Sequence, residues 1–431
     1  MRTCTGLFLL LTGAALALMA AEEPPKEWVD PDTGHRVVRL STEPGSESLY
    51  FHQNAYTADG KHLLITSPKG LESVNLDTRA IELLVPAPVN IIVAGRKTGQ
   101  VYYMKEGAIW AVDVATKKSH KIADRTNLPG GVSTLNADET LLAGVFTEGR
   151  GGGQRQGRGP RQGRGARNGG PGGFQRQAPL GADGKPLNKA DAKEVMLDRR
   201  LSEHIPMGLF TLNVKTGEVK TILRSTDWLN HLQFSPTDPT LLMFCHEGPW
   251  HKVDRIWTIR TDGSQLTKIH TRTMEMEIAG HEFWSADGRT IWYDLQTPRG
   301  EDFWVAGYNL DTHQRTWYHL ERNEWSVHFN VSPDGKLFAG DGGDNEMVAH
   351  AKDGKWIYLF RPEMVPNHGV ATLEQGLIKP GVFRSERLVN MSKHDYKLEP
   401  NVSFTPDMKW IVFRTNMFGP SQVLAVEIAK H

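Results

Sequence analysis

Short apolar runs alternate with polar turns along most of the chain, a pattern typical of short β-strands. The two clearest copies are residues 56–61, which lead into Leu63-Leu64-Ile65, and residues 331–336, which lead into Leu337-Phe338-Ala339. Each turn contains Asp-Gly, a pair that favours a hairpin because both residues tolerate positive φ. Weaker copies start near Ala94, Leu135, Phe234, Trp284 and Phe404. Counting gives seven units.

Repeats of about 40–50 residues with short strands predict an all-β fold, a seven-bladed β-propeller, because one four-stranded blade cannot bury both of its faces alone. A β-helix would have a shorter repeat. The segment 35–40 is expected to pair beside residues 421–426 near the other end of the chain. Such a pairing would close the ring and remove its sheet edges.

The start of the chain has the pattern of an export signal. Arg2 precedes an apolar run from Leu7 to Met19, and the small residues Ala20-Ala21 follow. Residues 1–21 are therefore predicted to be a cleaved signal peptide, which makes the protein periplasmic or secreted. The run is shorter than the ~20 apolar residues that span a bilayer, so no membrane span is expected. Cys245 then remains as the sole cysteine of the mature chain, without a disulfide partner.

One insertion interrupts the repeats of the single domain predicted over residues 22–431. It covers about 149–187, and its part from Gly149 to Gln177 is dominated by Gly, Arg and Gln. This composition predicts a disordered surface loop. An Arg/Gly tract can bind RNA or an acidic polysaccharide through charge, but export makes RNA an improbable partner. The 50 basic and 50 acidic residues also balance, so no nucleic-acid partner is expected.

Two His-Glu blocks carry the candidate chemistry, Cys245-His246-Glu247-Gly248-Pro249 and His281-Glu282-Phe283-Trp284. Histidine has an unperturbed pKa of ~6.5, so near neutral pH it serves as a base or as a metal ligand. The competing interpretation is a core histidine that orders a strand end. No nucleophile elbow, phosphate loop or dinucleotide fingerprint occurs, which weakens the hydrolase, kinase and dehydrogenase interpretations.

The chain resembles the oligogalacturonate lyases, seven-bladed propellers that cleave pectin fragments by β-elimination. The motifs that carry this resemblance are Trp228-Leu229-Asn230-His231, the Cys-His-Glu-Gly-Pro block, the His-Glu-Phe-Trp block, Gly340-Asp341-Gly342 and Ser403-Phe404-Thr405-Pro406-Asp407. Their order and spacing over several repeats make the resemblance far more specific than any single motif.

The resemblance implies a proton-accepting role for His246 and a manganese-ligating role for His281. The other three family ligands, a glutamine and two histidines, align here with Tyr396, Glu399 and Asn401. We therefore expect a rebuilt cation site at His281, Glu399 and Asn401, and one imidazole with oxygen donors favours a hard ion such as Ca or Mn. A hydrogen-bonded polar pair at the propeller mouth is the alternative.

Elimination across a uronate removes the proton next to the carboxylate, so a cation has to neutralise that carboxylate. A metal can do this, and an arginine can hold the carboxylate with two hydrogen bonds. Arg199 and Arg200, just after the insertion, are candidates, with surface salt bridges as the alternative, and Lys252 and Arg255 are equally available. Three further histidines are expected to converge on the central channel and contact substrate: His52, His231 and His328.

These observations predict an exported lyase that acts on an acidic oligosaccharide, with oligogalacturonate as the expected substrate. The rival hypothesis is a non-catalytic propeller that binds glycans or a partner at the cell envelope, as the loss of family ligands would permit.

Overall fold

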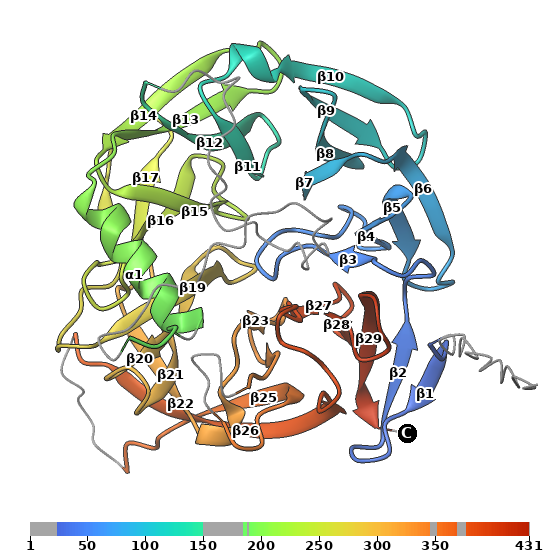
Figure 1. The fold of residues 1–431 in the computed structure, drawn as a ribbon, viewed down its shortest axis with the longest axis vertical. Coiled ribbons are helices and arrows are strands. Elements are labelled where there is room, and N and C mark those ends of the chain that lie inside the picture. The colour runs from blue at the N-terminus through green and yellow to red at the C-terminus, as the bar shows by residue number, and fades with distance from the viewer. Residues whose placement is uncertain (1–23, 150–183, 188, 345–350, 369–375, 431) are drawn as a thin grey trace, which may run out of the picture.

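The computed structural model describes residues 24–149, 184–187, 189–344, 351–368 and 376–430. The predicted signal peptide and most of the predicted insertion lie outside these residues. The described elements are almost all strands, and Figure 1 shows their sheets arranged as a ring. The all-β prediction is confirmed.

The described strands form six antiparallel or mostly antiparallel sheets, and four of them are four-stranded. In spatial order, one contains β3 (Glu47–Ser48), β4 (His62–Ser67), β5 (Gly70–Asn75) and β6 (Ile81–Pro86), and another contains β10 (Ser119–Asp124), β9 (Ala108–Asp113), β8 (Gln100–Lys105) and β7 (Asn90–Ala94). A third contains β11 (Gly131–Leu135), β12 (Leu141–Thr147), β13 (Met207–Asn213) and β14 (Val219–Ser225). The fourth contains β15 (Trp228–Phe234), β16 (Leu241–Glu247), β17 (Ile256–Arg260) and β18 (Thr267–Lys268).

The other two sheets are larger. One contains β1 (Glu27–Val29), β2 (His35–Arg39), β29 (Gln422–Lys430), β28 (Trp410–Thr415) and β27 (Ser403–Phe404). The other contains β19 (Ile278–Trp284), β20 (Thr290–Gln296), β21 (Phe303–Asn309), β22 (Arg315–Leu320), β26 (Lys379–Asn390), β25 (Trp356–Met364), β24 (Phe338–Gly340) and β23 (Phe329–Val331). In this eight-stranded sheet a parallel pairing of β22 with β26 joins two antiparallel halves.

The repeated turns connect the first and second strands of their sheets, as the Asp-Gly pattern predicts. At four of them a hydroxyl (Thr57, Ser285, Ser332 or Thr405) donates to the aspartate two residues later, at 2.6–2.7 Å. The same hydroxyl accepts the N–H five residues after it, at 2.9–3.1 Å. The residue after the aspartate has positive φ, which glycine adopts without steric cost. In the fourth copy Met408 takes that position, with φ 58°.

The predicted closing strand is also confirmed. β2 pairs antiparallel with β29, and Val37 lies opposite Val426, so the start of the described chain completes the sheet built by its end. The apolar faces of neighbouring sheets pack together: for example, Ala143 and Leu209 of one sheet share a buried cluster with Leu242 of the next. This packing between sheets buries the faces that a single sheet would leave in water.

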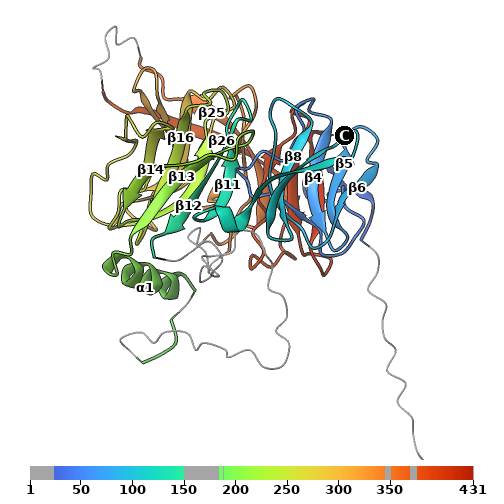
Figure 2. The ribbon, with the colours of Figure 1, turned by 90° about the horizontal axis from the view of Figure 1, so that it is seen from above.

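One α-helix, α1 (Lys189–Ser202), follows the insertion, and Figure 2 shows it on one face of the ring. Two 3₁₀ turns, η1 (Arg125–Asn127) and η2 (Arg322–Glu324), complete the described helical elements. Within the described part of the chain, no helix is both long and apolar enough to cross a membrane.

Candidate active site

A cavity of about 130 Å³ is lined in part by α1, the helix that Figure 2 shows on one face of the ring. Its walls come from β15, β16, β19 and β20, from α1 and from three loops, which carry Tyr50, Trp250 with Arg255, and Glu399. Its charged and imidazole side chains are Lys193, His231, Glu247, Arg255, His281, Asp294 and Glu399. The cavity thus brings together residues as far apart in the sequence as Tyr50 and Glu399.

His231 and His281 occupy matching positions on the first strands of consecutive sheets. The register of β15 against β16 shifts between Asn230 and Gln233, and the register of β19 against β20 shifts between Gly280 and Phe283. Both histidines have left-handed backbones, with φ of 50° and 45°. A β-bulge re-aims the side chain that it contains, and a left-handed non-glycine residue costs about 1–3 kcal/mol. The bulges direct both imidazoles into the cavity.

The imidazole of His231 lies between two carboxylates. Its Nε2 is 3.4 Å from Oε2 of Glu247, and its Nδ1 is 3.8 Å from Oε1 of Glu282. Burial nevertheless lowers the pKa of His231, against the opposing effect of the two carboxylates. His231 is therefore the neutral, proton-accepting form near neutral pH.

The pKa of His281 is shifted in the opposite direction. Burial alone would lower its pKa, but the Asp294 carboxylate, 2.9 Å from Nδ1, raises the pKa of His281 above its usual value. Asp294 lies on β20 directly opposite Gly280, so the strand register delivers the carboxylate to the histidine. The two matching bulges consequently present two histidines of different proton affinity to one cavity.

A buried ion pair in the cavity lining lies beside His231. Nη1 of Arg255 donates to Oε1 of Glu247 at 3.1 Å, and both side chains are almost fully buried. Burial alone would raise the pKa of Glu247, but Arg255 holds it at about 2. Glu282 is fully buried close by, and within the described structure neither of its carboxylate oxygens has a hydrogen-bond partner. The site therefore contains polar atoms that the folded chain leaves unsatisfied, which is unusual outside functional sites.

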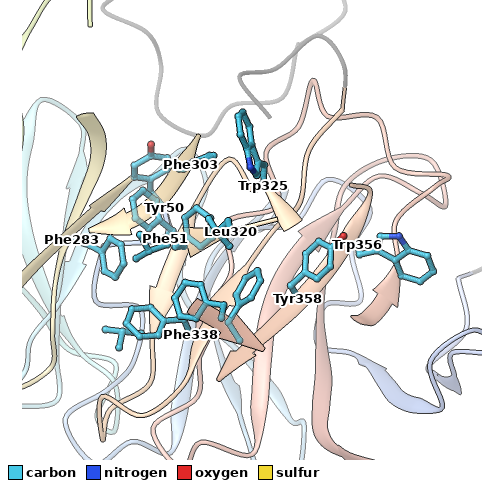
Figure 3. Packing of buried hydrophobic residues seen from close by; sticks show 14 residues of the cluster. Tyr50, Phe51, Phe283, Phe303, Leu320, Trp325, Phe338, Trp356 and Tyr358 are labelled. Atoms are coloured by element: carbon cyan, nitrogen blue, oxygen red, sulfur yellow. The ribbon is translucent and has the colours of Figure 1, made fainter. Parts of the chain in front are cut away.

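His52 and His328 lie deeper, against the aromatic pair Tyr50 and Phe51. Tyr50 is 4.9 Å from His52 and 5.1 Å from His328 between ring centroids, and His328 stacks on Phe51 at 4.7 Å. Figure 3 shows Tyr50 and Phe51 beside Phe283 at one side of a buried aromatic cluster. The predicted convergence of His52, His231 and His328 on the centre of the ring is what the structure shows, while their contact with substrate stays a prediction.

His246, the predicted base, lies elsewhere. It precedes Glu247 on β16, and successive side chains of a strand point to opposite faces. Its ring stacks on Trp257 at 4.8 Å, and its Nδ1 is 3.6 Å from Oδ2 of Asp227. His246 is not among the residues that line the cavity.

The two arginines that were expected to hold the substrate carboxylate also lie away from the cavity lining. Arg199 is exposed on α1, with its Nε 3.9 Å from Glu203. Arg200 lies over the ring of Trp228, at 5.6 Å, and contacts the sulfur of Met207. The cation that α1 does bring to the cavity is Lys193.

The structure shows where the three predicted cation ligands lie. His281 and Glu399 line the cavity, and Asn401 is buried with its Oδ1 lacking a partner within the described chain. Tyr396, the fourth aligned position, instead donates its hydroxyl to the Asp341 carbonyl at 2.9 Å. Among the described residues, no three His, Cys, Asp or Glu side chains are grouped to hold a metal ion. One imidazole, one carboxylate and one amide oxygen are donors of the types that a hard ion accepts, but Asn401 is not among the residues that line the cavity.

The family of this chain follows from its similarity to known proteins. The model of the oligogalacturonate lyase family matches residues 199–430, more than half of the chain. The chain belongs to the oligogalacturonate lyase family. The matched span contains both His-Glu blocks and the residues aligned with the family's remaining ligands, whereas Lys193 lies outside it.

Two individual relatives of the chain are also named as lyases of this kind. The chain is 30% identical over 230 residues to the oligogalacturonide lyase of Pectobacterium atrosepticum and 30% identical over 226 residues to the oligogalacturonate lyase of Dickeya dadantii. Each match covers 50% of this chain and 54% of the relative, so the chain spans about half the length of the curated relatives it matches.

The fold is shared over a longer stretch. An oligogalacturonate lyase solved in complex with manganese superposes with a TM-score of 0.67 at 23% identity, covering 94% of this chain and 96% of that one. The oligogalacturonate lyase of Vibrio parahaemolyticus gives the same TM-score and coverage at 21% identity. At such identities the likeness establishes the fold.

Three cavity residues escaped the sequence analysis: Tyr50, Lys193 and Asp294. Asp294 had a usable signal, because it is the one charged residue inside the apolar strand Thr290–Gln296. Lys193 had a weaker one, since it lies four residues before Leu197 and helical spacing puts both on one face. For Tyr50 the sequence carries no such signal.

Proposed function

We propose that the protein is a lyase that cleaves oligogalacturonate, or a related uronate-containing oligosaccharide, by β-elimination in this cavity. Membership of the family supports the reaction class. The observation that carries the proposal is the convergence of two histidines of different proton affinity, His231 and His281, with a lysine and two or more carboxylates around one small cavity.

The chemistry needs a base that removes the proton beside the carboxylate and a proton or cation that assists departure of the glycosidic oxygen. The resemblance gives the base role to His246, but the geometry supports His231. His231 lines the cavity and is held neutral by burial, whereas His246 stacks on Trp257 on the other face of β16. A positioned general base contributes about 10²–10⁴-fold. We assign the base role to His231, with His246 as the competing assignment.

The proposed cation site follows from the metal-donor atoms of three side chains. We propose that His281, Glu399 and Asn401 hold a divalent ion, Mn or Ca, which when bound supplies Lewis-acid stabilisation of the uronate carboxylate. Asp294 contacts Nδ1 of His281. A carboxylate in this position orients a histidine that ligates a metal through its other ring nitrogen. Titration calorimetry with Mn²⁺ and with Ca²⁺ tests this, and Asn401→Ala should weaken binding while a chelator lowers activity of the intact protein.

We further propose that the ring has seven blades. The eight-stranded sheet counts as two, because the parallel pairing of β22 with β26 spans only Thr316 to His319. The sheet closed by β2 and β29 is then the last blade. Export to the periplasm or exterior remains our proposal from the leader pattern of residues 1–21, and it would place the protein where acidic pectin fragments occur.

A non-catalytic glycan-binding propeller is the second candidate, and Tyr396 favours it. In place of a family ligand, this side chain is committed to the Asp341 carbonyl. The test that separates the two is incubation with several uronate oligomers, with and without chelator. The lyase predicts new near-ultraviolet absorbance from an unsaturated uronate, whereas binding without such a product would establish the second candidate.

A further inference from the structure

We propose that Lys193 is the carboxylate-binding residue of the cavity and makes it selective for acidic over esterified or neutral sugars. This inference rests on the proposed function and assigns a substrate contact within it. It also replaces the two arginines that the sequence suggested, since neither Arg199 nor Arg200 lines the cavity.

Helix α1 is anchored firmly enough to fix Lys193. Leu197, one turn further along the helix, is fully buried. Glu194 reaches Nη1 of Arg299 at 3.4 Å and Nδ1 of His251 at 3.8 Å, and Asp198 pairs with Lys252. These contacts hold the helix against the ring on the side of the cavity. Lys193 is therefore carried by an ordered element.

The ammonium of Lys193 is held over an aromatic ring. Its Nζ lies 4.7 Å from the ring centroid of Trp250, which also lines the cavity. A cation at this distance from an indole face is attracted to it by about 0.5–1 kcal/mol at exposed sites and more where water is excluded. Trp250 thus positions the charge without neutralising it, which leaves the donors of the ammonium available to a ligand.

The other cations of the cavity already have anionic partners. Arg255 pairs with Glu247 at 3.1 Å, and His281 pairs with Asp294 at 2.9 Å, whereas His231 is neutral. Lys193 has no hydrogen bond or ion pair with any residue in the part of the chain that the structure describes. An ordered, unpaired ammonium beside a cavity is suited to a carboxylate, which can accept a charge-assisted hydrogen bond from it.

Lys193 lines the cavity close to its ionisable side chains. Its charge acts on Glu247, on His281 and on Glu399. Because three carboxylates line the cavity, an acidic sugar would be repelled unless a cation offset them. Lys193 supplies that offset, and it lies before residue 199, where the match to the family model begins. The match to the family model therefore does not extend to Lys193.

Steady-state kinetics of Lys193→Met and Lys193→Arg, on trigalacturonate and on its methyl ester, tests the inference. We expect Lys193→Met to raise KM for the acid about tenfold, the loss of one charge-assisted contact, with little change for the ester. Lys193→Arg should restore most of the affinity, because it keeps the charge. The matched control is Lys220→Met, which removes one positive charge from the exposed part of β14 and should leave both KM values unchanged.

The outcomes separate this inference from the proposed function. Turnover by the wild type with an unchanged KM in Lys193→Met, or an equal change for acid and ester, would overturn the role of Lys193 alone. A wild type that neither turns over nor binds trigalacturonate in calorimetry would overturn both. Equal melting temperatures of the wild type and Lys193→Met would show that the variant is folded.

Discussion

His246 and Glu247 are neighbours in sequence, but they lie in two different environments. Glu247 belongs to the cavity, where it pairs with Arg255 and approaches His231. His246 belongs to the opposite face of β16, where it stacks on Trp257 beside Asp227. A shared motif therefore does not mean a shared site, because a strand sends adjacent side chains to opposite faces.

The largest expected effect of this difference is catalytic. His231→Gln should lower kcat by about 10²–10⁴-fold, the usual contribution of a general base, since its imidazole is the neutral one that lines the cavity. His246→Gln should lower kcat by less than about tenfold. Rate measurements on both purified variants check the assignment. The reverse order of effects would return the base role to His246.

The next effect concerns stability. Arg255→Met should destabilise the fold by about 3–5 kcal/mol, because it leaves the buried carboxylate of Glu247 without its cation. Chemical denaturation measures the loss. The double variant Arg255→Met, Glu247→Gln should recover part of it, since no charge is then stranded. A single variant as stable as the wild type would show that water or another cation already satisfies Glu247.

The same pair predicts a dependence on pH. The pKa of Glu247 is held at about 2, below its ordinary value of 4.5, so its ionised form stabilises the folded state. This contribution is fully present above about pH 4.5 and is lost as the pH falls toward 2. The stability difference between wild type and Glu247→Gln should therefore narrow between about pH 4.5 and about pH 2. A difference that stays constant over this range would contradict the depressed pKa.

The smallest expected effect belongs to the His246 face. His246→Ala should cost about 0.5–1.5 kcal/mol, the range for one stacked ring pair. Trp257→Ala removes the other ring, and a double-mutant cycle in denaturant isolates the coupling between them. A coupling near zero would mean that the stacking does not hold His246 in place, and the histidine could then turn toward a ligand.

Much of the fold could be predicted from the sequence because its signals are local. The Asp-Gly turns and the alternation of apolar runs lie within a few residues of the hairpins that they specify, and the pairing of β2 with β29 follows from the need to close the ring. The convergence of His52, His231 and His328 was foreseeable in the same way, since all three lie beside strand cores.

The composition of the cavity depends on finer geometry that the pattern does not carry. The bulges at His231 and His281 break the two-residue period, so counting along the strand does not give the face on which each side chain lies. On α1 the helical phase decides that Lys193 faces the cavity while Arg199 faces solvent. These shifts of a single residue explain why the sequence indicated the region of the site but did not show which cations line it.

Digestion of trigalacturonate in water labelled with heavy oxygen, followed by mass spectrometry, tests the central claim most directly. β-Elimination uses no water, so the account predicts an unsaturated product without the label, formed by the wild type and strongly reduced in His231→Gln. Saturated products that carry the heavy oxygen would show hydrolysis, and they would contradict both the proposed reaction and the role given to His231.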